Sequence, residues 1–161
     1  MKHITIILAF LITLSSPIAA QDFQKGYDAA QAGDFATALQ EWAPLAEAGD
    51  ASAQINLGFM YINGRGVPQD YKEAVKWYKL AAEQGLAQAQ YNLGVMYDNG
   101  DGVLQNNTMA HMWYNIGAAN GYEPGGSNRD KVAKRMTQAA IETAKAMARE
   151  CMSSGYTKCG Y

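Results

Sequence analysis

The chain has 161 residues and a formal net charge of −2 at pH 7, with 13 lysines and arginines against 15 aspartates and glutamates. This mild acidity argues against nucleic acid or an anionic membrane as the partner, because either would require a clustered basic face. The chain contains only two histidines, and none of the histidine spacings typical of zinc sites occurs. The composition therefore predicts neither a metal nor another cofactor.

Residues 1–20 have the pattern of a secretory signal peptide. Lys2 supplies the positive start, and an apolar run of 11 residues extends from Ile4 to Leu14. We expect cleavage after Ala20; a buried N-terminal helix is the alternative. The apolar run is too short to span a bilayer, so the mature chain is expected to be exported, periplasmic or secreted, without a membrane anchor.

Residues 21–52 are predicted to form a degenerate first repeat of the unit described next. Phe35 and Trp42 lie one period of 36 residues before Tyr71 and Tyr78, but the loop before them is shorter. A terminal repeat is expected to be atypical because one of its sides faces solvent.

A 36-residue repeat organises the middle of the chain. Residues 53–88 recur as residues 89–124, and 17 of the 36 positions are identical. A fixed period of this length is typical of stacked arrays and not of one globular core. The identical pairs include Ala53/Ala89, Leu57/Leu93, Gly58/Gly94, Met60/Met96, Tyr61/Tyr97, Ala74/Ala110, Trp77/Trp113 and Tyr78/Tyr114.

Each copy predicts a helix, a glycine-rich loop and a second helix, which in the first copy spans roughly residues 71–84. A glycine inside a helix costs about 1 kcal/mol relative to alanine, which is reasonable where another helix must come close. We therefore expect helix–helix contacts at Gly58 and Gly94. The Asn-Gly pairs at 63–64 and 99–100 tolerate positive φ and are expected to end the first helices.

The repeated pattern resembles the Sel-one-like repeat, a branch of the tetratricopeptide superfamily. Its signature, A-Q-x-N-L-G-x-M-Y-x-N-G-x-G-V followed by A-x-x-W-Y-x-x-x-A-x-x-G, is present in both copies. The second copy departs from it at Asn106, Asn107 and Thr108, where its second helix is expected to begin late or fray. The resemblance implies an all-α fold, an α/α superhelical solenoid that works as a scaffold for protein contacts.

Residues 125–161 are predicted to cap the solenoid with two helices and a tail. Ser127 is expected to start the first of them as its N-cap, because an acidic residue follows three positions later. Thr137 is expected to cap the second, which spans residues 138–152 and has an apolar stripe. The repeat motif does not extend into this segment, so the prediction rests on amphipathicity and position.

The two cysteines, Cys151 and Cys159, are eight residues apart. In an exported chain an even number of cysteines favours a disulfide over a metal site, and two free thiols are the alternative. The bond would fix the C-terminal tail and stabilise the chain by roughly 2 to 3 kcal/mol in the chain-entropy model.

Catalytic groups are scarce in residues 21–161. His111 is the only histidine there, and we expect it to be a packed or surface residue and not a ligand. The G-x-S-x-G, S-x-x-K and K-T-G motifs do not occur, which argues against the serine enzymes that use them. A Ser-His-Asp set brought together by folding stays open. We predict that the protein is not an enzyme.

The predicted function is binding of a peptide or protein segment on the concave face of the solenoid. Side-chain amides on the free stripe of the first helices can hydrogen-bond a peptide backbone or a terminal carboxylate, and aromatic rings add apolar contact. The alternative is that the asparagines only bridge neighbouring helices. The candidate binding residues are Asn56, Phe59, Asn63, Tyr91, Asn92, Val95 and Asn99.

A second functional hypothesis follows from the resemblance alone. Some secreted, cysteine-rich relatives of the Sel-one-like repeat bind or hydrolyse β-lactams, and the interval between Cys151 and Cys159 is similar to theirs. Those relatives carry a cysteine pair in each repeat, whereas residues 53–124 contain no cysteine. The resemblance therefore implies a β-lactam-binding protein or β-lactamase-like enzyme as the alternative function.

Overall fold

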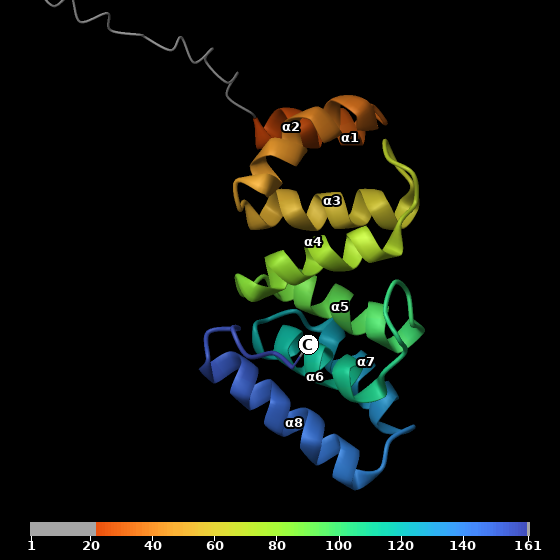
Figure 1. The fold of residues 1–161 in the computed structure, drawn as a ribbon, viewed down its shortest axis with the longest axis vertical. Helices are drawn as coiled ribbons and strands as arrows, with labels where there is room; N and C mark the ends of the chain where they lie inside the picture. The colour runs from red at the N-terminus through yellow and green to blue at the C-terminus, as the bar shows by residue number, and fades with distance from the viewer. Residues whose placement is uncertain (1–21, 161) are drawn as a thin grey trace, which may run out of the picture.

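The computed structural model describes residues 22–160, which form helices and no strand. The helices are α1 (Phe23–Gln31), α2 (Phe35–Glu47), α3 (Ala51–Asn63), α4 (Tyr71–Glu83), α5 (Ala87–Asn99), α6 (Asn107–Ala119), α7 (Pro124–Ala133) and α8 (Gln138–Ser153). Successive helices pack on one another, so that α1 to α6 stack in chain order and α8 closes the far end (Figure 1). The predicted all-α solenoid is confirmed, whereas the predicted signal peptide lies outside the described residues.

Short polar side chains start most of these helices by accepting backbone N–H groups of the first turn, which have no partner inside the helix. The N-cap side chains that do so are Asp22, Asp34, Asp50, Asp70, Asn106 and Thr137. Gly64 and Gly100 end α3 and α5 in the left-handed conformation, with φ of 61° and 83°. The Asn-Gly pairs therefore act as the sequence predicted.

The second helix of the second copy is complete, so the expectation of a late or frayed start was wrong. Asn106 takes the N-cap position that Asp70 holds one repeat earlier. Its side-chain oxygen accepts the N–H groups of Thr108 and Met109 at 3.0 and 3.1 Å. Asparagine caps a helix about as well as aspartate, so the altered segment still begins α6 at Asn107.

Gly58 and Gly94 lie at helix–helix contacts, which confirms the prediction. A Cβ atom on Gly58 would lie 2.4 Å from the ring of Tyr78, and one on Gly94 would lie 2.5 Å from the ring of Tyr114. Both rings are buried, with 1% of their surface exposed. The glycines therefore allow α3 to approach α4, and α5 to approach α6, more closely than any side chain would permit.

The loops after α3 and α5 connect each repeat to the one before it. Figure 1 shows both loops on the same side of the stack, each reaching back toward the preceding helix pair. A Cβ on Gly66 would lie 2.7 Å from the carbonyl oxygen of Phe35, and one on Gly102 would lie 2.4 Å from that of Tyr71. Both glycines also have positive φ, so these positions require glycine for two reasons.

The first C-terminal helix begins earlier than predicted. α7 starts at Pro124, and Ser127 lies inside the helix instead of capping it, so the predicted N-cap was wrong. Proline at the first helical position has a suitable φ and no N–H that needs a partner. Gly125 then lets α7 lie against α6, because a Cβ there would be 2.6 Å from the carbonyl oxygen of Tyr114.

α8 covers α6 and leads into a loop closed by a disulfide. Ala144, Ala148 and Cys151 are fully buried in the main apolar core, as their stripe predicted. Cys151 and Cys159 are bonded, which confirms the predicted disulfide over two free thiols. The bond holds the chain after α8 against the end of the solenoid.

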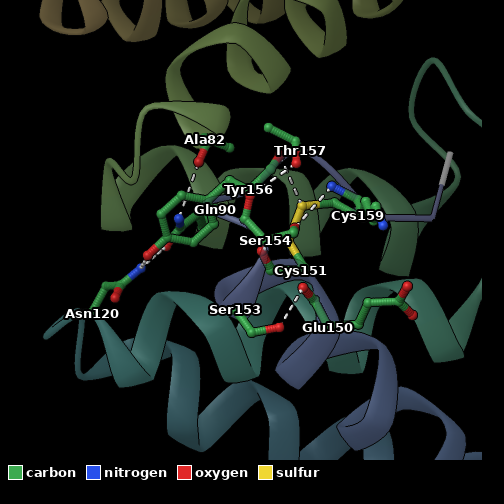
Figure 2. The surroundings of a disulfide bond; sticks show 11 residues. Ala82, Gln90, Asn120, Glu150, Cys151, Ser153, Ser154, Tyr156, Thr157 and Cys159 are labelled. Atoms are coloured by element: carbon green, nitrogen blue, oxygen red, sulfur yellow. Dashed lines mark hydrogen bonds between the residues drawn. A yellow bond between two sulfur atoms is a disulfide. The ribbon is translucent and has the colours of Figure 1, made fainter.

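The disulfide loop places Tyr156 on a polar contact between repeats (Figure 2). Gln90 donates a hydrogen bond to the carbonyl of Ala82 at 3.1 Å, and Asn120 donates to Gln90 at 2.8 Å. Asn120 also donates to the hydroxyl oxygen of Tyr156 at 2.8 Å. Equivalent bonds one repeat earlier join Gln54 to Ala46 and Gln84 to Gln54.

Replacing Gly58 with alanine is expected to destabilise the solenoid. The new methyl group would overlap the buried ring of Tyr78, and overpacking costs about 1 to 3 kcal/mol. A contact at 2.4 Å favours the upper end of that range. After a gain in helix propensity of about 1 kcal/mol, we expect a net loss of roughly 2 kcal/mol in the free energy of unfolding, measured by urea denaturation with circular dichroism.

Gly126→Ala is the matched control for this variant. Gly126 is also helical, but a Cβ there would meet nothing closer than 4.0 Å. Its replacement should leave the free energy of unfolding unchanged or raise it. Equal destabilisation by the two substitutions would contradict the close-contact explanation.

Candidate functional site

The helices α1, α3 and α5 are the first helices of three successive helix pairs, and a hollow lies between each neighbouring two of them. The hollow between α1 and α3 has a volume of about 280 Å³ and is lined by Tyr27, Phe35, Trp42, Asn56, Phe59 and Arg65, among others. The hollow between α3 and α5 has a volume of about 320 Å³ and is lined by Phe59, Ile62, Asn63, Tyr78, Asn92 and Val95, among others. Phe59 lines both hollows, so they adjoin, and together they are called the odd-helix groove.

Five of the seven candidate binding residues line this groove. Phe59, Asn63, Asn92 and Val95 line the hollow between α3 and α5, and Asn56 lines the other one together with Phe59. Phe59 is 48% exposed. The repeat period therefore placed most of the candidate side chains on one connected surface.

Tyr91 does not line the groove, because α7 covers it. The centre of its ring lies 5.4 Å from that of Tyr114 and 4.9 Å from that of Tyr122. Its hydroxyl oxygen accepts a hydrogen bond from Asn128 of α7 at 2.9 Å. Tyr91 thus packs against the C-terminal cap. The repeat pattern could not predict this contact, because α7 lies almost entirely outside the repeated segment.

Asn99 also lies outside the groove. It is the last residue of α5, and its side chain donates to the carboxylate of Asp101 at 3.0 Å. Its equivalent, Asn63, lines the groove while donating to the carbonyl of Phe59 at 2.7 Å. The two asparagines therefore differ in their surroundings although the repeat relates them.

Asn92 has a packing role in the floor of the groove. Burial raises the pKa of the Tyr78 hydroxyl, and a hydrogen bond from the Asn92 side chain lowers it in part. Thirty-six residues later, the Asn128 side chain likewise hydrogen-bonds the hydroxyl of Tyr114 and lowers its pKa in part. The alternative expectation, that the candidate asparagines bridge neighbouring helices, describes Asn92. Asn128, which makes the corresponding contact, was not among the candidates.

Arg65 is a groove residue that the repeat pattern did not identify. Its guanidinium carbon lies 5.2 Å from the centre of the Phe35 ring and 5.4 Å from that of Phe59. Asp101 occupies the equivalent position in the second copy, so comparing the copies marks the position only as variable. Phe35 belongs to α2 of the preceding helix pair, and the returning loop brings Arg65 to it.

Aromatic, aliphatic and amide side chains make up most of the groove. Arg65 is the only charged residue among the described side chains that line either hollow. Tyr27, at the α1 end, is 45% exposed, which is close to the value for Phe59. Such a surface suits an extended chain, with rings for apolar contact and amides for hydrogen bonds.

His111 is buried in α6, away from the groove. Only 2% of its surface is exposed, and its Nδ1 has no hydrogen-bond partner among the described residues. Burial lowers its pKa, and the positive charges of Arg129 and Lys145 lower it further. Asp130 and Glu142 act in the opposite direction and are weaker. His111 is thus a packed residue, as expected.

Residues 22–160 hold no group of three or more histidine, cysteine, aspartate or glutamate side chains that could bind a metal ion. They also hold no helix with the length and apolar character needed to cross a membrane.

Comparisons with known proteins agree with this architecture. The Sel1 repeat family model matches residues 51–86 and 87–122. One similar solved structure is the crystal structure of c5321, a protective antigen present in uropathogenic Escherichia coli strains and displaying an SLR fold. Its sequence is 27% identical to this chain, and the TM-score of the two structures is 0.77. A Sel1 repeat protein from Oxalobacter formigenes is 25% identical with a TM-score of 0.67. No curated protein matches the sequence.

The solved structures are longer than this chain. The match to c5321 covers 81% of this chain and 30% of that one. The match to the Oxalobacter formigenes protein covers 86% of this chain and 60% of that one. The chain therefore spans less than two thirds of either relative.

Stability is expected to fall as the pH is lowered from 6.5 because of His111. Since its pKa in the folded chain lies below the ordinary 6.5, the unfolded chain binds a proton that the folded chain does not. The contribution of neutral His111 to the free energy of unfolding is complete above pH 6.5 and is lost as the pH falls toward the pKa of His111 in the folded chain. Urea midpoints at pH 7.5 and 5.5 should show this loss, above the range in which carboxylates titrate.

His111→Val provides the comparison, because Val75 holds this position in the preceding copy. The variant should lose less stability than the wild type between these two pH values, whatever its stability at pH 7.5. An equal loss in both proteins would show that another group causes the pH dependence.

Proposed function

Because this chain carries two Sel1 repeats within a helical solenoid, we propose that it is a scaffold for protein contacts that binds a peptide or protein segment in the odd-helix groove. Sel1 repeats generally mediate protein interactions. The observation that carries the proposal is Phe59, which is 48% exposed at the junction of the two hollows. Asn56 lines the hollow on one side of it and can hydrogen-bond a segment there, whereas the Asn92 side chain in the other hollow is already hydrogen-bonded to Tyr78.

The groove favours a short segment and a weak complex. Covering an exposed phenylalanine contributes at most about 1.5 to 3 kcal/mol, and the two hollows are of modest size, about 280 and 320 Å³. Such an interface is at the small end of the specific range, and we expect an affinity in the micromolar range or weaker.

We further propose that binding, and not catalysis, is the function. Within residues 22–160, the side chains that line the groove offer aromatic, amide and aliphatic groups with one arginine, and no nucleophile paired with a base. The β-lactam alternative rests on the Cys151–Cys159 interval. Neither cysteine lines the groove, since their bond closes the loop after α8, and no observation favours this alternative.

Export is also part of the proposal. Residues 1–20 have the pattern of a signal peptide, and the Cys151–Cys159 bond fits an oxidising compartment, where disulfides persist. The periplasm or the exterior of the cell would provide such conditions.

Site-specific photo-crosslinking tests the groove as the binding surface. A photo-reactive amino acid in place of Phe59 should give a discrete crosslinked partner in the cells that produce the protein. The same amino acid in place of Leu80 is the control, because Leu80 is 44% exposed but lines neither hollow. Identical products from both positions in mass spectrometry, or none from position 59, would count against the proposal.

A further inference from the structure

Arg65 has an unusual environment for an exposed arginine. Its guanidinium lies over the rings of Phe35 and Phe59, at 5.2 and 5.4 Å from their centres. Among residues 22–160, these rings are the only partners of its guanidinium: no ion pair or hydrogen bond to a carboxylate or carbonyl engages it. The side chain is therefore positioned by contacts with ring faces, and its N–H groups are not used within the described part of the fold.

This arrangement favours recognition of a carboxylate. A guanidinium presents its donors in one plane, at its edge, and can bind a carboxylate through two parallel hydrogen bonds. Attraction to the two ring faces restricts the side chain before any partner arrives, and no residue among 22–160 engages its N–H donors. Because less side-chain freedom is then lost on binding, the same hydrogen bonds give a tighter complex.

The location of Arg65 indicates which carboxylate it meets. Phe59 lines both hollows, and Arg65 lies over the Phe59 ring. A segment that fills both hollows must cross Phe59, so the middle of that segment passes Arg65. A side chain in the interior of the segment, and not the chain terminus, is then the group that reaches the guanidinium.

The charge of the groove points the same way. Among residues 22–160, Arg65 is the only charged residue that lines the two hollows, so this part of the groove complements one negative charge. The equivalent residue of the next repeat, Asp101, lines neither hollow. Arg65 is therefore the position in the groove that suits an acidic side chain.

On the basis of the proposed function, we propose that the odd-helix groove selects an extended protein segment with an aspartate or glutamate between two apolar residues. The carboxylate binds Arg65, and the apolar side chains enter the hollows on either side of Phe59. Side chains two positions apart point to the same side of an extended chain. The preferred pattern is therefore apolar, any residue, acidic, any residue, apolar.

Defined peptides test this selectivity. The probes are fluorescent nine-residue peptides with acetylated and amidated ends, leucine at positions 3 and 7, and glutamate, glutamine or lysine at position 5, with mixed residues elsewhere. A fourth series has glutamine at position 5 and a free C-terminal carboxylate. Fluorescence anisotropy with the chain from residue 21 onward should show about tenfold tighter binding of the glutamate series than of the glutamine series, as for one charge-assisted hydrogen-bonded pair.

Two variants assign the preference to Arg65. Arg65→Gln should bind the glutamate and glutamine series equally weakly. Its unfolding temperature should fall only slightly, because the lost contacts with Phe35 and Phe59 contribute little to stability at an exposed site. Lys72→Gln removes an exposed charge that does not line the groove, and it should keep the full preference. Added salt should reduce the preference in the wild type.

The possible failures are distinguishable. If Arg65→Gln keeps the preference for glutamate, or if the lysine or free-carboxylate series binds best, the inference about the acidic side chain is overturned. The proposed groove then still stands, provided that Phe59→Ala weakens all series. If no series binds the wild type, both the inference and the proposed function fail.

Discussion

The structure depends on the close contact between a glycine of one helix and a tyrosine ring of the next. The ring of Tyr78 fills the space where a side chain of Gly58 would be, and the ring of Tyr114 does the same at Gly94. Each buried hydroxyl is then held by an asparagine from the following odd-numbered helix, Asn92 or Asn128. One contact therefore sets the distance within a repeat, and its hydrogen bond sets the distance to the next repeat.

This spacing explains where the groove is open and where it is closed. Between α3 and α5 the side chains leave a hollow around Phe59 and Asn92. Between α5 and α7 the corresponding space is taken by Tyr91, whose ring meets Tyr122 and whose hydroxyl meets Asn128. The preceding copy has Ile55 in place of Tyr91, and an isoleucine is too short to close the gap in this way. The preceding copy also has Leu86 in place of Tyr122, so at least two differences between the copies contribute to the asymmetry of the face.

The C-terminal end of the solenoid uses the same hydrogen bonds that join the repeats. Asn120 bonds to Gln90 as Gln84 bonds to Gln54, and Tyr156, one further period along the chain, accepts a bond from Asn120. The disulfide between Cys151 and Cys159 closes the loop that presents Tyr156 (Figure 2). The loop therefore satisfies a polar group that a further repeat would otherwise cover.

The sequence by itself determined the repeat unit, because helix ends and turns depend on residues near one another in the chain, and a glycine repeated inside a helix marks where another helix must approach. Gly58 and Gly94, the Asn-Gly turns and the Thr137 cap could all be predicted on this basis, as could the disulfide. Only the tertiary structure decided the surroundings of Tyr91 and Arg65. Tyr91 is covered by Asn128 of α7, and Arg65 lies over Phe35 of the preceding helix pair. The start of α7 at Pro124 is similar, since the approach of Gly125 to Tyr114 is a contact between helices. Periodicity records what the repeats have in common, whereas the groove is shaped by the positions at which they differ.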